Sequence, residues 1–249
     1  MRQLPLKGGR LSFLMLGDRS GIIRNCELGV RNDRGLGRSF ESSFKMERYM
    51  TQKERMNAGL LYRGFDEELT KERQRAKRLL HEYNNVIDPD DGEKREELLR
   101  SLLGGMGNDV WLEPPFRCDY GSNIELGHGV YSNYNLTVLD CAKVTIGNHV
   151  LIGPNVGIYT AGHAIDPALR KAGWEFAQPI TIEENVWIGA GVSICPGVTI
   201  GENSVIGAGS VVTKEIPSNV IAVGNPCRVL RAITDEDKKY YFKDKEIDV

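Results

Sequence analysis

The stretch ITIEENVWIGAGVSICPGVTIGENSVIGAGSVV, residues 180–212, carries an aliphatic residue at every sixth position. These positions hold Ile182, Ile188, Ile194, Ile200, Ile206 and Val212. A second row, two residues earlier in each repeat, consists of Ile180, Val186, Val192, Val198, Ser204 and Ser210. A period of six fits neither an α-helix nor a simple alternating strand, but it is typical of a β-helix with about six residues on each side of a coil. We therefore expect the aliphatic side chains to fill one shared core.

The repeat extends upstream of this stretch. It continues as Val144/Ile146, Val150/Ile152 and Val156/Ile158, and an earlier set is offset by two residues, namely Ile124, Val130 and Leu136. An insertion near Asp140 would explain the offset. The 28 glycines gather in this half of the chain, and glycine and asparagine suit corners that need a positive φ. The pattern predicts a mainly β fold, a left-handed parallel β-helix over residues 116–232.

Residues 46–115 are predicted to form a helical segment ahead of the β-helix. Thr51 with Glu54 makes a capping-box pattern, and a second helix is expected from Asp66. A third helix is expected from about Glu93 to Leu103, ending before the glycine pair 104–105. We interpret the basic run at 71–78 as a solvated helix face rather than a binding patch.

Composition and the two ends of the chain restrict the class of protein. The 32 Lys and Arg against 34 Asp and Glu do not suggest a nucleic-acid binder, and no apolar run is as long as a membrane span. Five scattered cysteines indicate reduced thiols, so we expect a cytoplasmic protein without membrane partners. Residues 1–45 are expected to be a disordered extension, or sequence ahead of a start at Met46 or Met50, with an Arg-rich targeting peptide as the alternative. Residues 233–249 are expected to be a C-terminal tail.

One long interruption divides the repeats. Ile158 and Ile182 are four periods apart, yet residues 160–179 between them do not follow the aliphatic rule. We predict a loop that protrudes from the solenoid and returns to it, and such loops commonly carry function. The loop contains His163, and histidine can take up a proton near neutral pH, which makes it a candidate general base. A structural or solvated histidine is the alternative.

A metal site is the other chemistry that the histidines could serve. A zinc enzyme of the γ-carbonic-anhydrase type needs three histidines that converge on one metal. His128, His149 and His163 do not share one repeat phase, so we expect no metal.

Several motifs carry a resemblance to a known family. The more diagnostic are FRCDYGSNI (116–124), NYNLTVLD (133–140) and IYTAGHAIDP (158–167). AGLLYR (58–63), PITIEENVWIG (179–189), PGVTIGENSVIGAGSVVTK (196–214) and GNPCRV (224–229) add to them. From about Met50 to Asp244, roughly four-fifths of the chain, the sequence resembles the maltose and galactoside O-acetyltransferases, which are hexapeptide-repeat acyltransferases.

This resemblance implies transfer of an acetyl group from acetyl-CoA to a sugar hydroxyl of the maltose, glucose or galactoside type, in a direct ternary complex. His163 matches the position of the catalytic base in this family. Acceptor-binding positions are matched by Asp119, Tyr131, Asn133 and Glu175. Positions along the acetyl and pantetheine channel are matched by Trp187, Ala190 and Ala208, and the nucleotide end of CoA by Thr213, Lys214, Arg228 and Arg231. The resemblance also implies a homotrimer with active sites between neighbouring β-helices.

Some residues depart from the family pattern. Ala164 stands where the family often has proline, and Cys141 stands where galactoside enzymes place an acidic residue, although Asp140 remains. Asp119 and Glu175 resemble the maltose branch, whereas YYFKD (240–244) resembles the galactoside branch, so the acceptor sugar stays open. The alternatives are an acetyltransferase for serine or an antibiotic, and a non-catalytic solenoid that serves only assembly.

Overall fold

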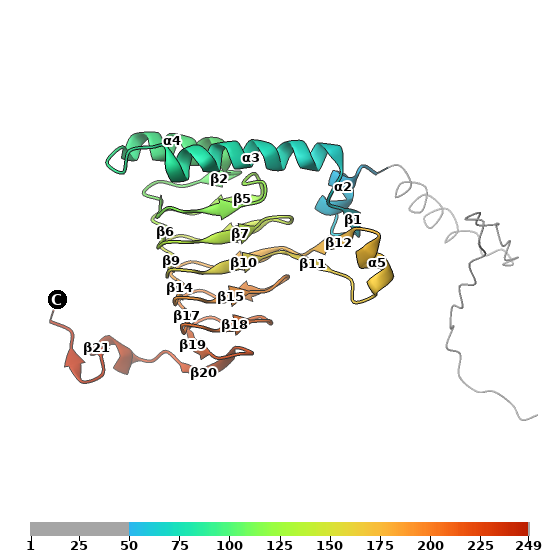
Figure 1. The fold of residues 1–249 in the computed structure, drawn as a ribbon. Helices are drawn as coiled ribbons and strands as arrows, with labels where there is room; N and C mark the ends of the chain where they lie inside the picture. Colours follow the sequence, from blue (N-terminus) through green and yellow to red (C-terminus); the bar gives the residue numbers. More distant parts are fainter. Residues whose placement is uncertain (1–49, 249) are drawn as a thin grey trace, which may run out of the picture. The chain divides into compact units, whose positions relative to one another are not determined.

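The computed structural model describes residues 50–248, and the extension predicted for residues 1–45 lies outside them. Within the described part, short parallel strands wind as a β-solenoid, and two long helices lie across one end of it (Figure 1). A small antiparallel sheet stands beside the coils. The predicted mainly β solenoid with N-terminal helices is confirmed.

Three sheets form the faces of the solenoid, and the chain passes from face 3 to face 1 to face 2 in each coil. Face 1 consists of β4 (Arg117–Cys118), β7 (Thr137–Leu139), β10 (Gly157–Tyr159), β15 (Ser193–Ile194) and β18 (Val211–Val212). Face 2 consists of β2 (Gly105–Met106), β5 (Ile124–Leu126), β8 (Val144–Ile146), β13 (Ile180–Ile182) and β16 (Thr199–Ile200). Face 3 consists of β3 (Trp111–Leu112), β6 (Tyr131–Ser132), β9 (Leu151–Ile152), β14 (Trp187–Ile188), β17 (Val205–Ile206), β19 (Val220–Val223) and β20 (Arg228–Ala232).

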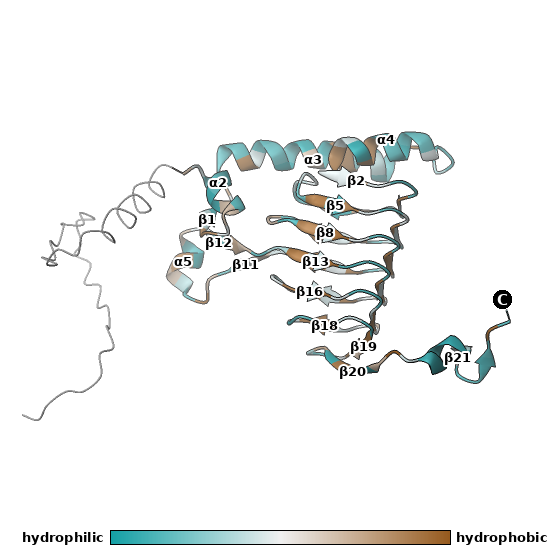
Figure 2. Ribbon diagram, turned by 180° about the vertical axis from the view of Figure 1, so that it is seen from behind, coloured by the Kyte–Doolittle hydropathy of each residue, from teal (hydrophilic) through white to brown (hydrophobic). Residues whose placement is uncertain are grey.

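Strand pairing follows the six-residue repeat. Ile182 pairs with Ile200, three periods further on, and the six repeated aliphatic residues of 182–212 are all fully buried. Ile124 pairs with Val144, which is two residues more than three periods, so the predicted offset is confirmed. The additional residues lie at the corner between faces 1 and 2. Figure 2 shows hydrophobic residues along the stacked strands β5, β8 and β13, where they form the core.

The corner between faces 2 and 3 is built from residues that tolerate a left-handed backbone. Asn185, Asn203 and Asn219 have φ values of 58°, 59° and 59°. Their side chains form a ladder, in which Asn185 Nδ2 donates to Asn203 Oδ1 at 3.1 Å and Asn203 Nδ2 donates to Asn219 Oδ1 at 3.0 Å. Asparagine adopts this conformation more readily than most side chains, which explains its recurrence at this corner in the last three coils, whereas Asp109, Gly129 and His149 have positive φ there in the earlier ones.

The helical segment consists of α2 (Gln52–Asn57), α3 (Glu67–Asn85) and α4 (Gly92–Leu102). The capping box of Thr51 and Glu54 and the start of α3 after Asp66 are as predicted. The segment is fixed to the first coil by Asn84, whose Nδ2 donates to Phe116 O at 2.8 Å and whose Oδ1 accepts from Phe116 N at 2.9 Å. Within residues 50–248, no helix combines the length and the apolar character that a bilayer crossing requires.

The ends of the solenoid differ slightly from the predicted segments. Strands β2 and β3 already belong to faces 2 and 3, so the coils include residues ahead of 116. At the other end, β20 pairs with β19 in antiparallel orientation. The predicted tail contains a 3-10 helix η1 (Asp235–Lys238) and a hairpin of β21 (Tyr240–Phe242) and β22 (Lys245–Glu246).

The segment 160–179 protrudes from the solenoid as predicted, but it has regular structure. It forms β11 (Ala161–His163), α5 (Pro167–Lys171) and β12 (Trp174–Ala177). Strand β12 also pairs with β1 (Tyr62–Arg63), which gives the antiparallel sheet β1-β12-β11 beside the coils (Figure 1). On either side of it, β10 pairs with β15 and β13 pairs with β8, so the register of the coils resumes.

Candidate active site

His163 is the last residue of β11 and is exposed. Its cross-strand partner is Glu175 in β12, and directly opposed residues of an antiparallel pair have Cβ atoms about 5 Å apart. Glu175 is in turn the partner of Tyr62 in β1. The N-terminal segment therefore fixes the strand that lies opposite the histidine.

A cavity of about 410 Å³ lies where this sheet meets the corner between faces 1 and 2. His163, Asp119 and Glu175 all line it, so three of the predicted site residues come together in one chain. The remaining wall includes Gly64, Phe65, Arg73, Tyr120, Leu139, Cys141, Ala161 and Gly162. None of the other predicted site residues lines this cavity.

Asp140 holds the backbone that carries Asp119. Its Oδ1 accepts hydrogen bonds from Asp119 N at 3.0 Å and from Tyr120 N at 2.9 Å, and its backbone oxygen accepts from Asn123 Nδ2 at 2.7 Å. Burial raises the pKa of Asp140 to about 6, against the opposing effect of these backbone donors. The additional residues at this corner thus hold Asp119 and Tyr120 in the wall of the cavity.

Asp119, one of the two carboxylates predicted to bind the acceptor, lies in this part of the cavity wall. Burial raises its pKa, while Cys141, Arg73 and Lys77 act in the opposite direction. Cys141 Sγ donates to Asp119 Oδ2 at 3.5 Å, and burial raises the pKa of the thiol to about 12. Cys141 is therefore a neutral hydrogen-bond donor in this chain, at the position where the resemblance places an acidic residue in galactoside enzymes.

Arg73 is a cavity residue that the sequence interpretation missed. Its guanidinium donates to Tyr120 Oη at 2.6 Å and to Gly64 O at 2.5 Å. On α3 it shares the buried face with Leu69, Ala76 and Leu80, a spacing that could have distinguished it from its neighbours. The solvated-face interpretation of 71–78 is correct for most of the cations there and wrong for Arg73, which is half-buried.

The second group of predicted residues lies at the corner between faces 3 and 1. It consists of Tyr131, Asn133, Trp187, Ala190 and Ala208. Tyr131 and Trp187 are 37% and 55% exposed in one column of face 3. Next to the two alanines, a Cβ placed on Gly191 or Gly209 would meet no atom within 4 Å. This corner therefore presents a strip of uncovered backbone, which an extended ligand such as pantetheine could approach closely.

The residues predicted for the nucleotide end occupy the last coils. Thr213 and Lys214 follow β18 and are exposed. Arg228 begins β20, with its Nη1 donating to Cys227 O at 2.7 Å. Arg231 already forms an ion pair with Asp237, at 2.6 and 2.7 Å. Lys214 and Arg228 are therefore better candidates than Arg231 for binding phosphate.

The residues around the His163 cavity and the group that contains Asn133, Ala190 and Ala208 lie at opposite edges of face 1. Ala190 precedes β15 and Cys195 follows it, so the width of face 1 separates the edge before this strand from the edge after it. His163 belongs to the edge after face 1, whereas Asn133 and Ala208 belong to the edge before it. Within one chain, the two halves of the predicted site do not meet.

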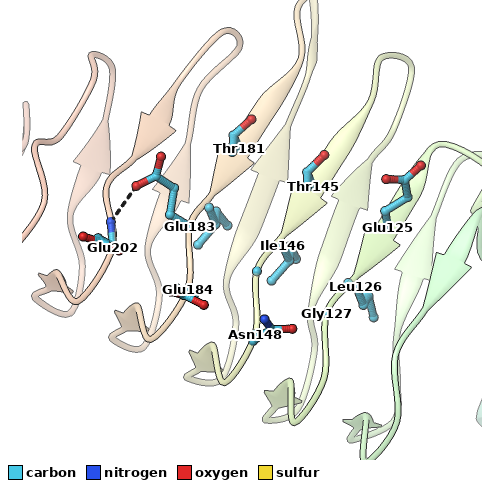
Figure 3. Close-up of a pocket in the computed structure, with 12 residues that line it drawn as sticks. Glu125, Leu126, Gly127, Thr145, Ile146, Asn148, Thr181, Glu183, Glu184 and Glu202 are labelled. Carbon is cyan, nitrogen blue, oxygen red and sulfur yellow. Dashed lines mark hydrogen bonds between the residues drawn. The ribbon is translucent and has the colours of Figure 1, made fainter.

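A larger hollow, of about 570 Å³, lies on face 2 (Figure 3). Glu125, Thr145 and Thr181 project from its strands, and Glu202 N donates to Glu183 Oε2 at one end at 2.9 Å. None of the predicted site residues lines it, and residues 50–248 contain no cluster of three metal-ligating side chains. The chemistry is therefore better placed at the smaller cavity beside His163.

Two segments of the chain match family models. Residues 55–107 match the maltose acetyltransferase hexapeptide capping motif, and residues 179–214 match the bacterial transferase hexapeptide in six repeats. Together with the solenoid and its histidine-bearing hairpin, these matches define the class as hexapeptide-repeat acyltransferases.

Relatives and solved structures narrow the class. The galactoside O-acetyltransferase of Escherichia coli K12 is 51% identical over 199 residues, which cover 80% of this chain and 98% of that protein. A solved galactoside acetyltransferase in complex with coenzyme A has a TM-score of 0.78 at 50% identity and covers 80% of this chain and 100% of that chain. A maltose O-acetyltransferase from Clostridium difficile 630 has a TM-score of 0.73 at 52% identity, over 75% of this chain and 99% of that chain. The chain belongs to the galactoside and maltose O-acetyltransferase family.

Proposed function

We propose that this protein transfers an acetyl group from acetyl-CoA to a hydroxyl of a sugar, with His163 as the general base. The observation that carries the proposal is the meeting of His163, Asp119, Glu175 and Arg73 around one cavity. Carboxylates and a guanidinium are suited to hydrogen bonds with sugar hydroxyls, and a histidine among them can accept a proton. The coenzyme A in a solved relative and the substrates after which the relatives are named support both reactants.

His163 accepts the proton of the attacking hydroxyl as its oxygen forms a bond to the acetyl carbon and the carbon–sulfur bond breaks. The histidine then delivers this proton to the departing sulfur. Asp119 and Glu175 accept hydrogen bonds from other hydroxyls of the sugar, and Arg73 donates one. Acetyl-CoA supplies the thioester when bound, and the transfer is direct, so the residues need only orient and deprotonate the acceptor.

The site is completed by a second copy of the chain in a homotrimer. Tyr131, Asn133 and Trp187 of one copy face the His163 cavity of the next, and Ala190 and Ala208 lie along the pantetheine. Thr213, Lys214, Arg228 and Arg231 surround the nucleotide, where cations favour phosphates. The apolar column Tyr131, Leu151 and Trp187 on face 3 supports this assembly, because its exposed surface is better buried between copies.

The test is release of coenzyme A thiol with maltose, glucose, galactosides, serine and chloramphenicol as acceptors. We expect turnover with sugars by the wild-type protein and almost none by His163→Ala. Turnover with serine or chloramphenicol alone would show that the acceptor is not a sugar, and the proposed substrate class would be wrong. A variant as active as wild type would reject His163 as the base.

A further inference from the structure

A second closed cavity, of about 370 Å³, lies where α3 and α4 meet the first strand of face 3. Its volume is within the range of sites that hold small molecules. Leu99 and Leu112 give it apolar walls, and Trp111 lies at one side, since a Cβ placed on Gly92 would be 3.7 Å from the indole ring. None of its lining residues belongs to the His163 cavity.

Arg95 on α4 is a buried cation in the wall of this cavity. It is 6% exposed, and its Nε and Nη1 have no hydrogen-bond partner. None of the ion pairs formed within residues 50–248 includes Arg95, and its neighbour Glu96 pairs with Arg100 instead, at 2.7 Å. A buried charge without a counter-ion is costly, so an anion beside Arg95 would stabilise the folded protein.

The aromatic ring beside Arg95 does not supply this anion. The guanidinium carbon lies 5.5 Å from the centre of the Tyr83 ring, and the Tyr83 hydroxyl donates to Leu112 O. Burial raises the pKa of Tyr83 to about 12, against the opposing effect of Arg95, so the hydroxyl stays neutral near pH 7. The negative charge that Arg95 requires must therefore come from a group in the cavity.

The rim of the cavity has the opposite charge. Glu93 and Asp109 line it and are exposed, and neither takes part in an ion pair within the described part of the chain. These carboxylates repel a ligand that is only anionic and attract one that also carries a positive group. Trp111, which is 38% exposed, adds an aromatic face of the kind that cations contact.

We infer that this cavity binds a small zwitterion of the amino-acid class. The carboxylate of the ligand lies against Arg95, its ammonium group lies near Glu93 and Asp109, and its apolar side chain contacts Leu99 and Trp111. The inference does not depend on the acetyl transfer proposed above, because the two cavities share no residue.

The test is isothermal titration calorimetry of the full-length protein with L-leucine. Isocaproate, which lacks the ammonium group, isoamylamine, which lacks the carboxylate, and inorganic phosphate serve as comparison ligands. We expect L-leucine to bind more tightly than all three. Arg95→Met should weaken the binding of L-leucine at least tenfold, because hydrogen bonds to a charged group are lost. This variant should fold, since methionine replaces an unpaired buried charge by an apolar chain.

Asp109→Asn tests the other end of the ligand. Asparagine tolerates the φ of 57° at this position, so the backbone should be kept while the negative charge is removed. We expect weaker binding of L-leucine and no weakening of isocaproate. Equal losses for both ligands would overturn the assignment of the ammonium group to the rim.

Arg78→Met is the matched control, because Arg78 is an exposed arginine of α3 that does not line the cavity. It should bind L-leucine as wild type does. Absence of L-leucine binding, or equal affinity in wild type and Arg95→Met, would overturn the inference. Tighter binding of isocaproate or phosphate would also overturn it and make the cavity a site for simple anions. If Arg95→Met instead changes the oligomeric state in size-exclusion chromatography, a second copy of the chain supplies the carboxylate and the zwitterion is rejected.

Discussion

At the scale of single residues, the role proposed for His163 rests on its position beside the cavity and not on burial of its side chain. It is exposed on β11, with Glu175 opposite and Asp119 across the cavity. We predict that His163→Ala lowers kcat by about 10²- to 10⁴-fold, the usual contribution of a general base. Affinity for acetyl-CoA, measured by calorimetry, should change little. His81→Ala is the control, because His81 is an exposed histidine of α3 distant in sequence from the hairpin. A similar loss of kcat in both variants would contradict the assignment.

Asp140 gives a prediction about stability. Folding raises its pKa from the ordinary 3.8 to about 6, so the folded protein binds this proton more tightly than the unfolded chain does. The free energy of unfolding should therefore fall as the pH rises from 4 to 7, by on the order of 2 kcal/mol from this residue. Asp140→Asn removes the titration but keeps an oxygen for Asp119 N and Tyr120 N.

Urea unfolding at pH 4 and pH 7 measures this effect. The stability of wild type relative to Asp140→Asn should be lower at pH 7 than at pH 4, by about the same 2 kcal/mol. The other titrating groups are common to both proteins and largely cancel in the difference. Parallel pH profiles would show that the backbone donors around Asp140 fully offset its burial.

At the scale of elements, the corners between faces 2 and 3 depend on asparagine for two separable reasons. Asn203 has a φ of 59° and links Asn185 to Asn219. Asn203→Ala loses both hydrogen bonds and forces alanine into the left-handed region, at a total of about 2–3 kcal/mol. Asn203→Gly loses the hydrogen bonds without the strain and should cost about half as much. Chemical unfolding of both variants measures the difference, and equal losses would show that the backbone conformation contributes nothing.

The elements that the sequence predicted are those determined by local patterns. The capping box at Thr51, the start of α3 after Asp66 and the rows of isoleucine depend on neighbouring residues or on a fixed period. The strands of the hairpin do not, because β12 is completed by β1 from more than a hundred residues earlier in the chain. No periodicity connects Tyr62 to Glu175, so the sequence predicted a loop where a sheet forms.

The candidate site shows the same limit. His163 was predicted from the interruption of the repeats, and Asp119 and Glu175 through a family resemblance, and all three share one cavity. Phe65 and Arg73 lie in the same cavity through the docking of the helical segment onto the coils, which a sequence pattern does not specify. Arg73 was predicted to be solvated because it stands in a basic run, although its helical phase is that of Leu69 and Ala76.

At the scale of the whole molecule, the arrangement of the site suggests how it is assembled. The His163 cavity and the strip at Ala190 and Ala208 lie at the two opposite edges of face 1. A rigid solenoid does not bring its own edges together. If both groups serve one reaction, each active site must combine one edge from one copy with the other edge from its neighbour.

Complementation between two inactive variants tests this directly. His163→Ala disables one edge, and Ala208→Trp fills the exposed strip at the other edge, so each variant alone should be inactive in the proposed homotrimer. In trimers reassembled from an equal mixture, about one quarter of the interfaces combine two intact edges, and thiol release should return to about that fraction of wild type. A mixture of His163→Ala with Asp119→Ala is the control, because both changes affect the same edge and no interface becomes intact. If mixed trimers of the first pair form but remain inactive, the site is not shared between copies, and the strip at Ala208 must serve something other than the reaction at His163.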